Sequence, residues 1–114
     1  MMAMRFAVAG AMLAVVPLAM AAEGSATVKI ISPEDGAKLD AMAQNKIAYD
    51  VNPGPNGDHI HLYVDGDEAA LLRQLKGAYT LDSLTPGEHR ICIKVVNKNH
   101  TPIGAERCVK VTVQ

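Results

Sequence analysis

Tryptophan is absent from the 114-residue sequence, phenylalanine occurs once and tyrosine three times. Sugar-stacking surfaces and extended binding grooves depend on aromatic faces, so the sequence disfavours sites of these kinds. An excess of one charge is also missing, because eleven Lys and Arg residues are balanced by twelve Asp and Glu residues. No nucleic-acid partner is therefore expected, since contact with many phosphates requires a basic excess.

Recognisable catalytic motifs are also missing. The sequence has neither a Gly-x-Ser-x-Gly elbow nor a glycine-rich phosphate loop. Ser25, Ser32 and Ser83 fall in a tail or in turns, and none has an obvious base beside it. Asp65-Gly66-Asp67 resembles part of a calcium loop, but the remaining ligand positions do not follow and turn chemistry explains the segment. We therefore expect a protein that is not an enzyme.

No apolar run is long enough for a permanent membrane span. Arg5 precedes an apolar stretch of about 14 residues, whereas a spanning helix needs about 20. Ala19-Met20-Ala21 then has the small-x-small pattern of a signal-peptidase site. The alternative, an N-terminal helix of the fold, is disfavoured because the stretch has no polar face. The predicted organisation is a signal peptide at 1–21, a short tail at 22–27 and one periplasmic or secreted domain at 28–114.

Short segments of alternating polarity fill the rest of the chain. Residues 28–30, 47–51 and 59–65 alternate apolar and polar side chains with the period of a β-strand, and Gly- and Pro-rich turns separate them. Many short strands with frequent turns predict an all-β fold, an antiparallel immunoglobulin-like β-sandwich of about seven strands. Residues 68–76 fit either one helical turn or an edge strand.

Two cysteines, Cys92 and Cys108, suit a cross-strand disulfide. If the last two strands form a hairpin folded about residue 100, residues whose numbers sum to about 200 face each other, and this pair does. Such a pair lies about 4.5–5.5 Å apart, within disulfide range, and export provides an oxidising compartment. Metal ligation by two thiolates and a redox pair remain as alternatives, although no Cys-x-x-Cys spacing supports the redox role.

Three of the four histidines are predicted to meet at one end of the sandwich. His59 and His61 are two residues apart on a strand, so their rings project from one face. Antiparallel pairing with the penultimate strand brings them beside the 97–104 loop, which carries His100. Because imidazole suits copper and zinc, the three are candidate ligands for a copper or zinc ion. A solvated strand face, or a contact surface for an exported protein or a ligand, remains open as an alternative.

The fourth histidine, His89, is expected at the opposite end of the sandwich. It begins the penultimate strand, about 23 Å of strand away from the other three. A polar ring at a strand start can hydrogen-bond the turn backbone, so the predicted role of His89 is structural. The same strand register predicts a surface ion pair between Asp65 and Arg90.

Several motifs resemble those of known bacterial domains. Ile31 to Ala37, Tyr63 to Gly66 and Leu84 to His89 resemble the opening, the end of the third strand and a late turn of bacterial Ig-like domains. A closer resemblance is to small exported bacterial Ig-like β-sandwich domains of unknown function, and it rests on three motifs: His59-Ile60-His61, Pro86-Gly87-Glu88-His89 and Asn97-Lys98-Asn99-His100-Thr101-Pro102. The resemblance implies the fold and export, and no activity.

Two functional hypotheses therefore stand side by side. The first is a periplasmic or secreted, non-catalytic module that binds copper or zinc through histidines. The second is a metal-free Ig-like domain that uses the same end of the sandwich to contact an exported protein partner.

Overall fold

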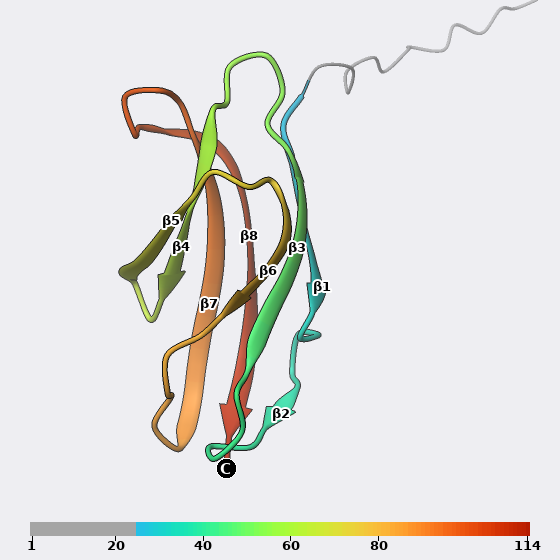
Figure 1. Cartoon of the computed structure of the whole chain (residues 1–114), viewed down its shortest axis with the longest axis vertical. Coiled ribbons are helices and arrows are strands. Elements are labelled where there is room, and N and C mark those ends of the chain that lie inside the picture. Colours follow the sequence, from blue (N-terminus) through green and yellow to red (C-terminus); the bar gives the residue numbers. More distant parts are fainter. Residues whose placement is uncertain (1–24) are drawn as a thin grey trace, which may run out of the picture.

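A computed structural model describes residues 25–114, which fold as a two-layered β-sandwich (Figure 1). The predicted signal peptide lies outside the described residues. The all-β fold is confirmed, with eight strands where about seven were expected, and the first begins at Thr27. The strands are β1 (Thr27–Ser32), β2 (Lys38–Leu39), β3 (Lys46–Asn52), β4 (His59–Val64), β5 (Asp67–Leu72), β6 (Lys76–Thr80), β7 (Gly87–Val96) and β8 (Pro102–Val113).

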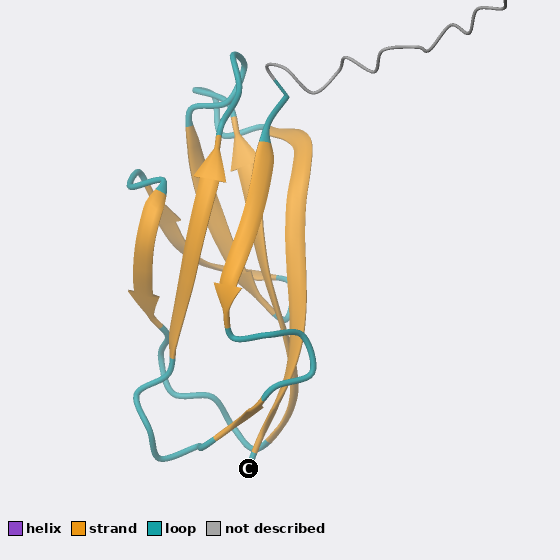
Figure 2. Cartoon of the chain, turned by 90° about the vertical axis from the view of Figure 1, so that its right-hand side faces the viewer, coloured by secondary structure: helices purple, strands orange, loops and turns teal. Residues whose placement is uncertain are grey.

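The strands are divided between a three-stranded and a five-stranded sheet. The smaller sheet has the order β1-β3-β6, and the larger has the order β2-β8-β7-β4-β5. All pairs are antiparallel except β2 with β8, where a two-residue strand lies parallel to the end of the chain. Figure 2 shows the two layers side by side, joined by loops at both ends. No helix of the described residues is long and apolar enough to cross a membrane.

The core lies between the two sheets and takes one face from each long strand. The period-two alternation of the sequence places every second side chain inward. Burial of each large aliphatic side chain stabilises the fold by about 1.5–3 kcal/mol, so the core is the main source of stability. The buried cluster consists of Val28, Ile47, Tyr49, Val51, Ile60, Leu62, Leu81, Ile91, Ile93, Val95, Val109 and Val111.

The ambiguous stretch 68–76 contains no helix and consists of most of β5, a three-residue connection and the first residue of β6. Its first part belongs to β5, the edge strand of the larger sheet, paired with β4 through Val64↔Asp67 and Ile60↔Leu72. The connecting residues Asp65 and Gly66 both have positive φ, 53° and 89°, as in the two-residue turns that match the twist of a hairpin. This turn and the pairing with β4 override the helix-forming composition of the segment.

The hairpin of β7 and β8 has the register expected from the sequence. Cys92 pairs with Cys108, and the two sulfurs form a disulfide with a Cα–Cα distance of 4.0 Å. The predicted disulfide is therefore confirmed, and the sulfurs are not thiolate ligands or a free redox pair. The register shifts between Lys94 and Val96, next to the hairpin loop, so β8 begins at Pro102 and the loop is shorter than the expected 97–104.

Candidate metal centre

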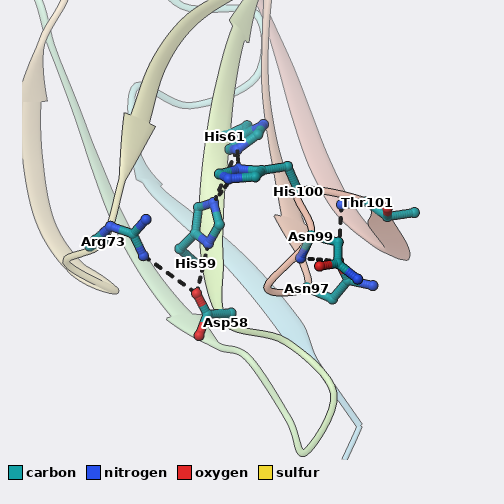
Figure 3. Close-up of polar contacts among 8 residues, drawn as sticks. All are labelled: Asp58, His59, His61, Arg73, Asn97, Asn99, His100 and Thr101. Carbon is teal, nitrogen blue, oxygen red and sulfur yellow. Dashed lines mark hydrogen bonds and ion pairs between the residues drawn. The ribbon is translucent and has the colours of Figure 1, made fainter.

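The rings of His59, His61 and His100 lie together at the end of the sandwich where β4 begins (Figure 3). Nε2 of His59 is 3.1 Å from Nε2 of His61 and 3.1 Å from Nδ1 of His100. Nε2 of His61 is 3.3 Å from Nδ1 of His100. Three ring nitrogens thus converge, although two come from β4 and the third from the loop between β7 and β8. We call these three residues the histidine cluster.

The start of β4 is held against the end of β7. The backbone N–H of Asp58 donates to the carbonyl of Val96 at 2.8 Å, and His59 is the register partner of Val96. A Cβ at Gly57 would lie 2.3 Å from the Pro53 carbonyl oxygen and 2.6 Å from Val95 Cγ1, so the close approach of this loop requires glycine. The turn at Pro53–Gly57, which directly precedes Asp58 and β4, therefore helps to position the two strand histidines.

The loop that carries His100 is organised around Asn97. Its backbone carbonyl accepts from the N–H of His100 at 2.9 Å, and its N–H donates to the Thr101 carbonyl at 2.9 Å. Its side-chain Oδ1 accepts from the N–H groups of Asn99 and Thr101, at 2.8 and 3.1 Å. His100 takes a left-handed conformation with φ 65°. The loop thereby turns the third ring back toward β4.

The two strand histidines are buried, with exposed fractions of 1% for His59 and 5% for His61. The solvated strand face considered from the sequence is therefore wrong for these two rings. They lie on the face of β4 opposite the core residues Ile60 and Leu62, where His100 lies against both, with ring centroids 4.7 and 5.4 Å away. His100 itself is exposed. The cluster is closed on the strand side and reaches solvent on the loop side.

Carboxylates face the outer nitrogens of both strand histidines. Nδ1 of His59 is 2.9 Å from Oδ2 of Asp58, which also accepts a 3.5 Å hydrogen bond from Nη1 of Arg73. Nδ1 of His61 is 3.4 Å from Oε1 of Glu68. A carboxylate can only accept, so this arrangement keeps the ring proton on Nδ1 and leaves the lone pair on Nε2. In both rings the nitrogen that faces the cluster is therefore the one free to bind a cation.

Protons alone cannot satisfy the convergent nitrogens. The rings of His59 and His61 carry their protons on Nδ1, on the side away from the cluster. The three nitrogen–nitrogen contacts within the cluster can therefore share only one proton, the one on Nδ1 of His100. Addition of a second proton to the cluster is unfavourable, because burial lowers the pKa of His61. Glu68 partly raises this pKa, and the other two histidines lower it further. The hydrogen bond from His59 lowers the pKa of Asp58, so this carboxylate stays charged. A buried group of lone pairs backed by carboxylates favours a bound cation.

His89 lies at the other end of the larger sheet, away from the cluster. Its Nε2 donates to the Thr85 carbonyl at 2.7 Å and its Nδ1 donates to Oδ2 of Asp65 at 2.6 Å. These bonds tie the turn before β7 to the turn after β4. The prediction of an Asp65–Arg90 ion pair is wrong. Oδ1 of Asp65 accepts from the backbone N–H of Arg90, and Oδ2 of Asp65 faces Nδ1 of His89.

Sequence reasoning missed Asp58, Glu68 and Arg73. Asp58 offered a signal, because an acidic residue directly precedes a candidate ligand. Glu68 reaches His61 because β4 and β5 shift register between Leu62 and Tyr63, a detail that polarity patterns do not encode. Among residues 25–114, one group of His, Cys, Asp or Glu side chains has its ligand atoms close enough to share an ion, and that group is the histidine cluster.

Comparisons with known proteins support the fold. No family model matches the chain, and no curated protein matches it. Among solved structures, a fibronectin(III)-like module of CbhA from Clostridium thermocellum is 18% identical, with a TM-score of 0.64 over 77% of this chain and 96% of that module. The CARDB domain of a Pyrococcus furiosus protein, solved in complex with di-metal ions, is 18% identical, with a TM-score of 0.51 over 79% of this chain and 88% of that domain.

A larger protein also contains a similar sandwich. The Bacteroides ovatus protein SGBP-B, solved in complex with a mixed-linkage heptasaccharide, is 20% identical, with a TM-score of 0.52 over 76% of this chain and 24% of that protein. At these identities the similarity concerns the fold alone. The chain therefore contains an Ig-like, fibronectin-III-like β-sandwich domain. The three-histidine group at its end could hold a metal ion.

Proposed function

We propose that this protein is an exported, non-catalytic module that binds one copper or zinc ion through Nε2 of His59, Nε2 of His61 and Nδ1 of His100. The observation that carries the proposal is the convergence of these three nitrogens to within 3.3 Å of one another. Imidazole nitrogen is a preferred donor for both metals. The function is coordination for sequestration or delivery of the ion.

The surroundings of the rings support the proposal. Metal-binding histidines commonly give their other ring N–H to a carboxylate, which orients the ring and increases its basicity. Asp58 and Glu68 stand in these places behind His59 and His61. The hydrogen-bonded loop around Asn97 holds the third ring in place before any ion arrives, which reduces the entropy cost of binding.

Export belongs to the same proposal. The signal-like segment at residues 1–21 and the disulfide between Cys92 and Cys108 both suit the periplasm or the extracellular space. We expect N-terminal sequencing of the exported protein to begin at Ala22. A chain that retains Met1 in the exported fraction would contradict the cleavage.

Metal titration tests the binding. Zn²⁺ and Cu²⁺ are titrated separately into the purified protein, and we expect one-to-one binding of at least one of them. His100→Gly removes a ligand, and glycine accepts the left-handed backbone at this position, so the fold is retained. The affinity of His100→Gly for the metal ion should fall by more than about 100-fold, which exceeds the loss typical when a residue that only hydrogen-bonds a ligand is removed.

His89→Gln is the matched control, because this histidine lies outside the cluster and should leave the affinity unchanged. His61→Gln provides a second ligand variant on β4. Absence of one-to-one binding, or equal affinity in His100→Gly and wild type, would make the metal proposal wrong. The interaction domain without metal would then be the better hypothesis for the same end of the sandwich.

A further inference from the structure

The three cluster nitrogens form a nearly equilateral triangle, with edges of 3.1, 3.1 and 3.3 Å. With metal–nitrogen bonds near 2.0–2.1 Å, tetrahedral angles separate two ligand nitrogens by about 3.3 Å. Three positions of a square plane would instead give two separations of about 2.9 Å and one of about 4.1 Å. The observed edges match one face of a tetrahedron and lack the long edge of a square plane.

An ion cannot lie at the centre of this triangle. The centre is about 1.8 Å from each nitrogen, shorter than a metal–nitrogen bond of about 2.0–2.1 Å. The ion must therefore stand about 0.9 Å out of the plane of the nitrogens, with its remaining bonding direction pointing away from all three. The three histidines then form a tripod, and in a four-coordinate ion they leave one position unfilled.

No fourth His, Cys, Asp or Glu side chain of the described residues joins the three histidines. The potential ion-binding group at residues 25–114 consists of the histidine cluster. Asp58 and Glu68, the nearest carboxylates described above, face Nδ1 of His59 and His61, on the outer side of each ring. His100 is exposed while the two strand histidines are buried, so the loop side of the cluster is open to solvent.

We infer that the histidine cluster holds its ion in a tetrahedral environment whose fourth position is taken by an exchangeable external donor. Water fills it in the absence of other ligands, and small anionic or nitrogen donors replace the water. The inference rests on the proposed metal binding and adds its coordination number and its open position. A three-histidine site of this kind can pass an ion to a partner by ligand exchange, because the partner's donor can bind before a histidine leaves.

Cobalt provides the test, since tetrahedral Co²⁺ absorbs visible light much more strongly than octahedral Co²⁺. The purified protein is loaded with Co²⁺, and azide and, separately, imidazole are then titrated while the bound cobalt is quantified. We expect the intense spectrum of a tetrahedral ion and a saturable shift of its bands at constant cobalt content. In His100→Gly the affinity for Co²⁺ should fall by more than about 100-fold, and in His89→Gln the spectrum should be unchanged.

The outcomes separate this inference from the proposed function. Cobalt that binds one-to-one through the cluster, but gives a weak octahedral spectrum or no response to either donor, overturns the open tetrahedral position and leaves metal binding intact. Loss of cobalt when azide or imidazole is added also overturns it, because the donor would then compete with the protein for the ion. A protein that binds Cu²⁺ but neither Co²⁺ nor Zn²⁺ overturns this inference alone, and a protein that binds none of the three ions overturns the proposed function as well.

Discussion

Asp58 and His59 are consecutive residues whose side chains are bonded to each other: Nδ1 of His59 donates to Oδ2 of Asp58 at 2.9 Å. The pair directs Nε2 of the imidazole into the histidine cluster. Arg73 contacts the same carboxylate oxygen at 3.5 Å, so the acidic group is held from two sides. Asp58, which directly precedes β4, thus orients the ring of His59, the first residue of that strand.

Asp58→Asn should therefore weaken metal binding without unfolding the domain. The amide oxygen can still accept from Nδ1, but the negative charge behind the ring, which offsets the charge of a bound cation, is lost. We expect the affinity for Zn²⁺ to fall about 10-fold, and about 100-fold in Asp58→Ala, measured by competition with a chromophoric chelator. Asp50→Asn is the matched control, because Asp50 lies on β3 and faces Lys76. An affinity of Asp58→Ala equal to that of Asp50→Asn would contradict the role of Asp58.

His100→Gly should separate ligand loss from loss of fold. The left-handed backbone at φ 65° carries a steric cost for any residue with a Cβ, and glycine removes it while adding conformational entropy to the unfolded chain. These effects oppose each other, so the unfolding free energy of the metal-free protein should stay within about 1 kcal/mol of wild type. Urea denaturation with a chelator present measures it. A larger loss would mean that the ring stabilises the fold through its contacts with His59 and His61.

Much of the fold could be predicted because period-two polarity and turn residues determine which face of each strand is buried. The register Cys92↔Cys108 followed from the position of the hairpin turn. The state of residues 68–76 could not be predicted, because their composition favours a helix, while pairing with β4 makes the part up to Leu72 a strand.

The histidine cluster was accessible to the same reasoning, since strand order and register bring His59 beside the loop that carries His100. The burial of the His59 and His61 rings could not be predicted, because a polar strand face is normally solvated. Here the loop around Asn97 turns His100 back over that face, which depends on a positive φ that polarity patterns do not report.

Removal of the disulfide should destabilise the domain and leave the histidine cluster intact. Cys92 and Cys108 are separated by 16 positions. The loss of chain constraint for a loop of about 15 residues costs about 3 kcal/mol. We expect this decrease in unfolding free energy for the double variant Cys92→Ala/Cys108→Ala in urea, with metal affinity unchanged under folding conditions. A decrease below about 1 kcal/mol would contradict the expected contribution of the disulfide.

His89 should make stability depend on pH near neutrality. Both of its ring nitrogens face acceptors, Oδ2 of Asp65 and the Thr85 carbonyl, so the folded structure favours the protonated ring. The hydrogen bond with Asp65, followed by that with Thr85, raises the pKa of His89 above its ordinary value. The folded state thus binds this proton more tightly than the unfolded state. The resulting stabilisation is complete below the unfolded pKa of about 6.5 and is lost as pH rises through the higher folded value.

His89→Gln, compared with wild type, tests this dependence. Glutamine cannot carry the charge, so the variant lacks the pH-dependent part of the stabilisation. The difference in unfolding free energy should be largest at about pH 6, below the unfolded pKa, and should shrink toward about pH 9. Urea denaturation across this range, with a chelator present, measures both proteins. The comparison cancels the opposite effect of His61, whose lowered pKa reduces stability as pH falls, because both proteins contain that residue. A difference that is constant across the range, or that grows with pH, would show that the proton on His89 does not stabilise the fold.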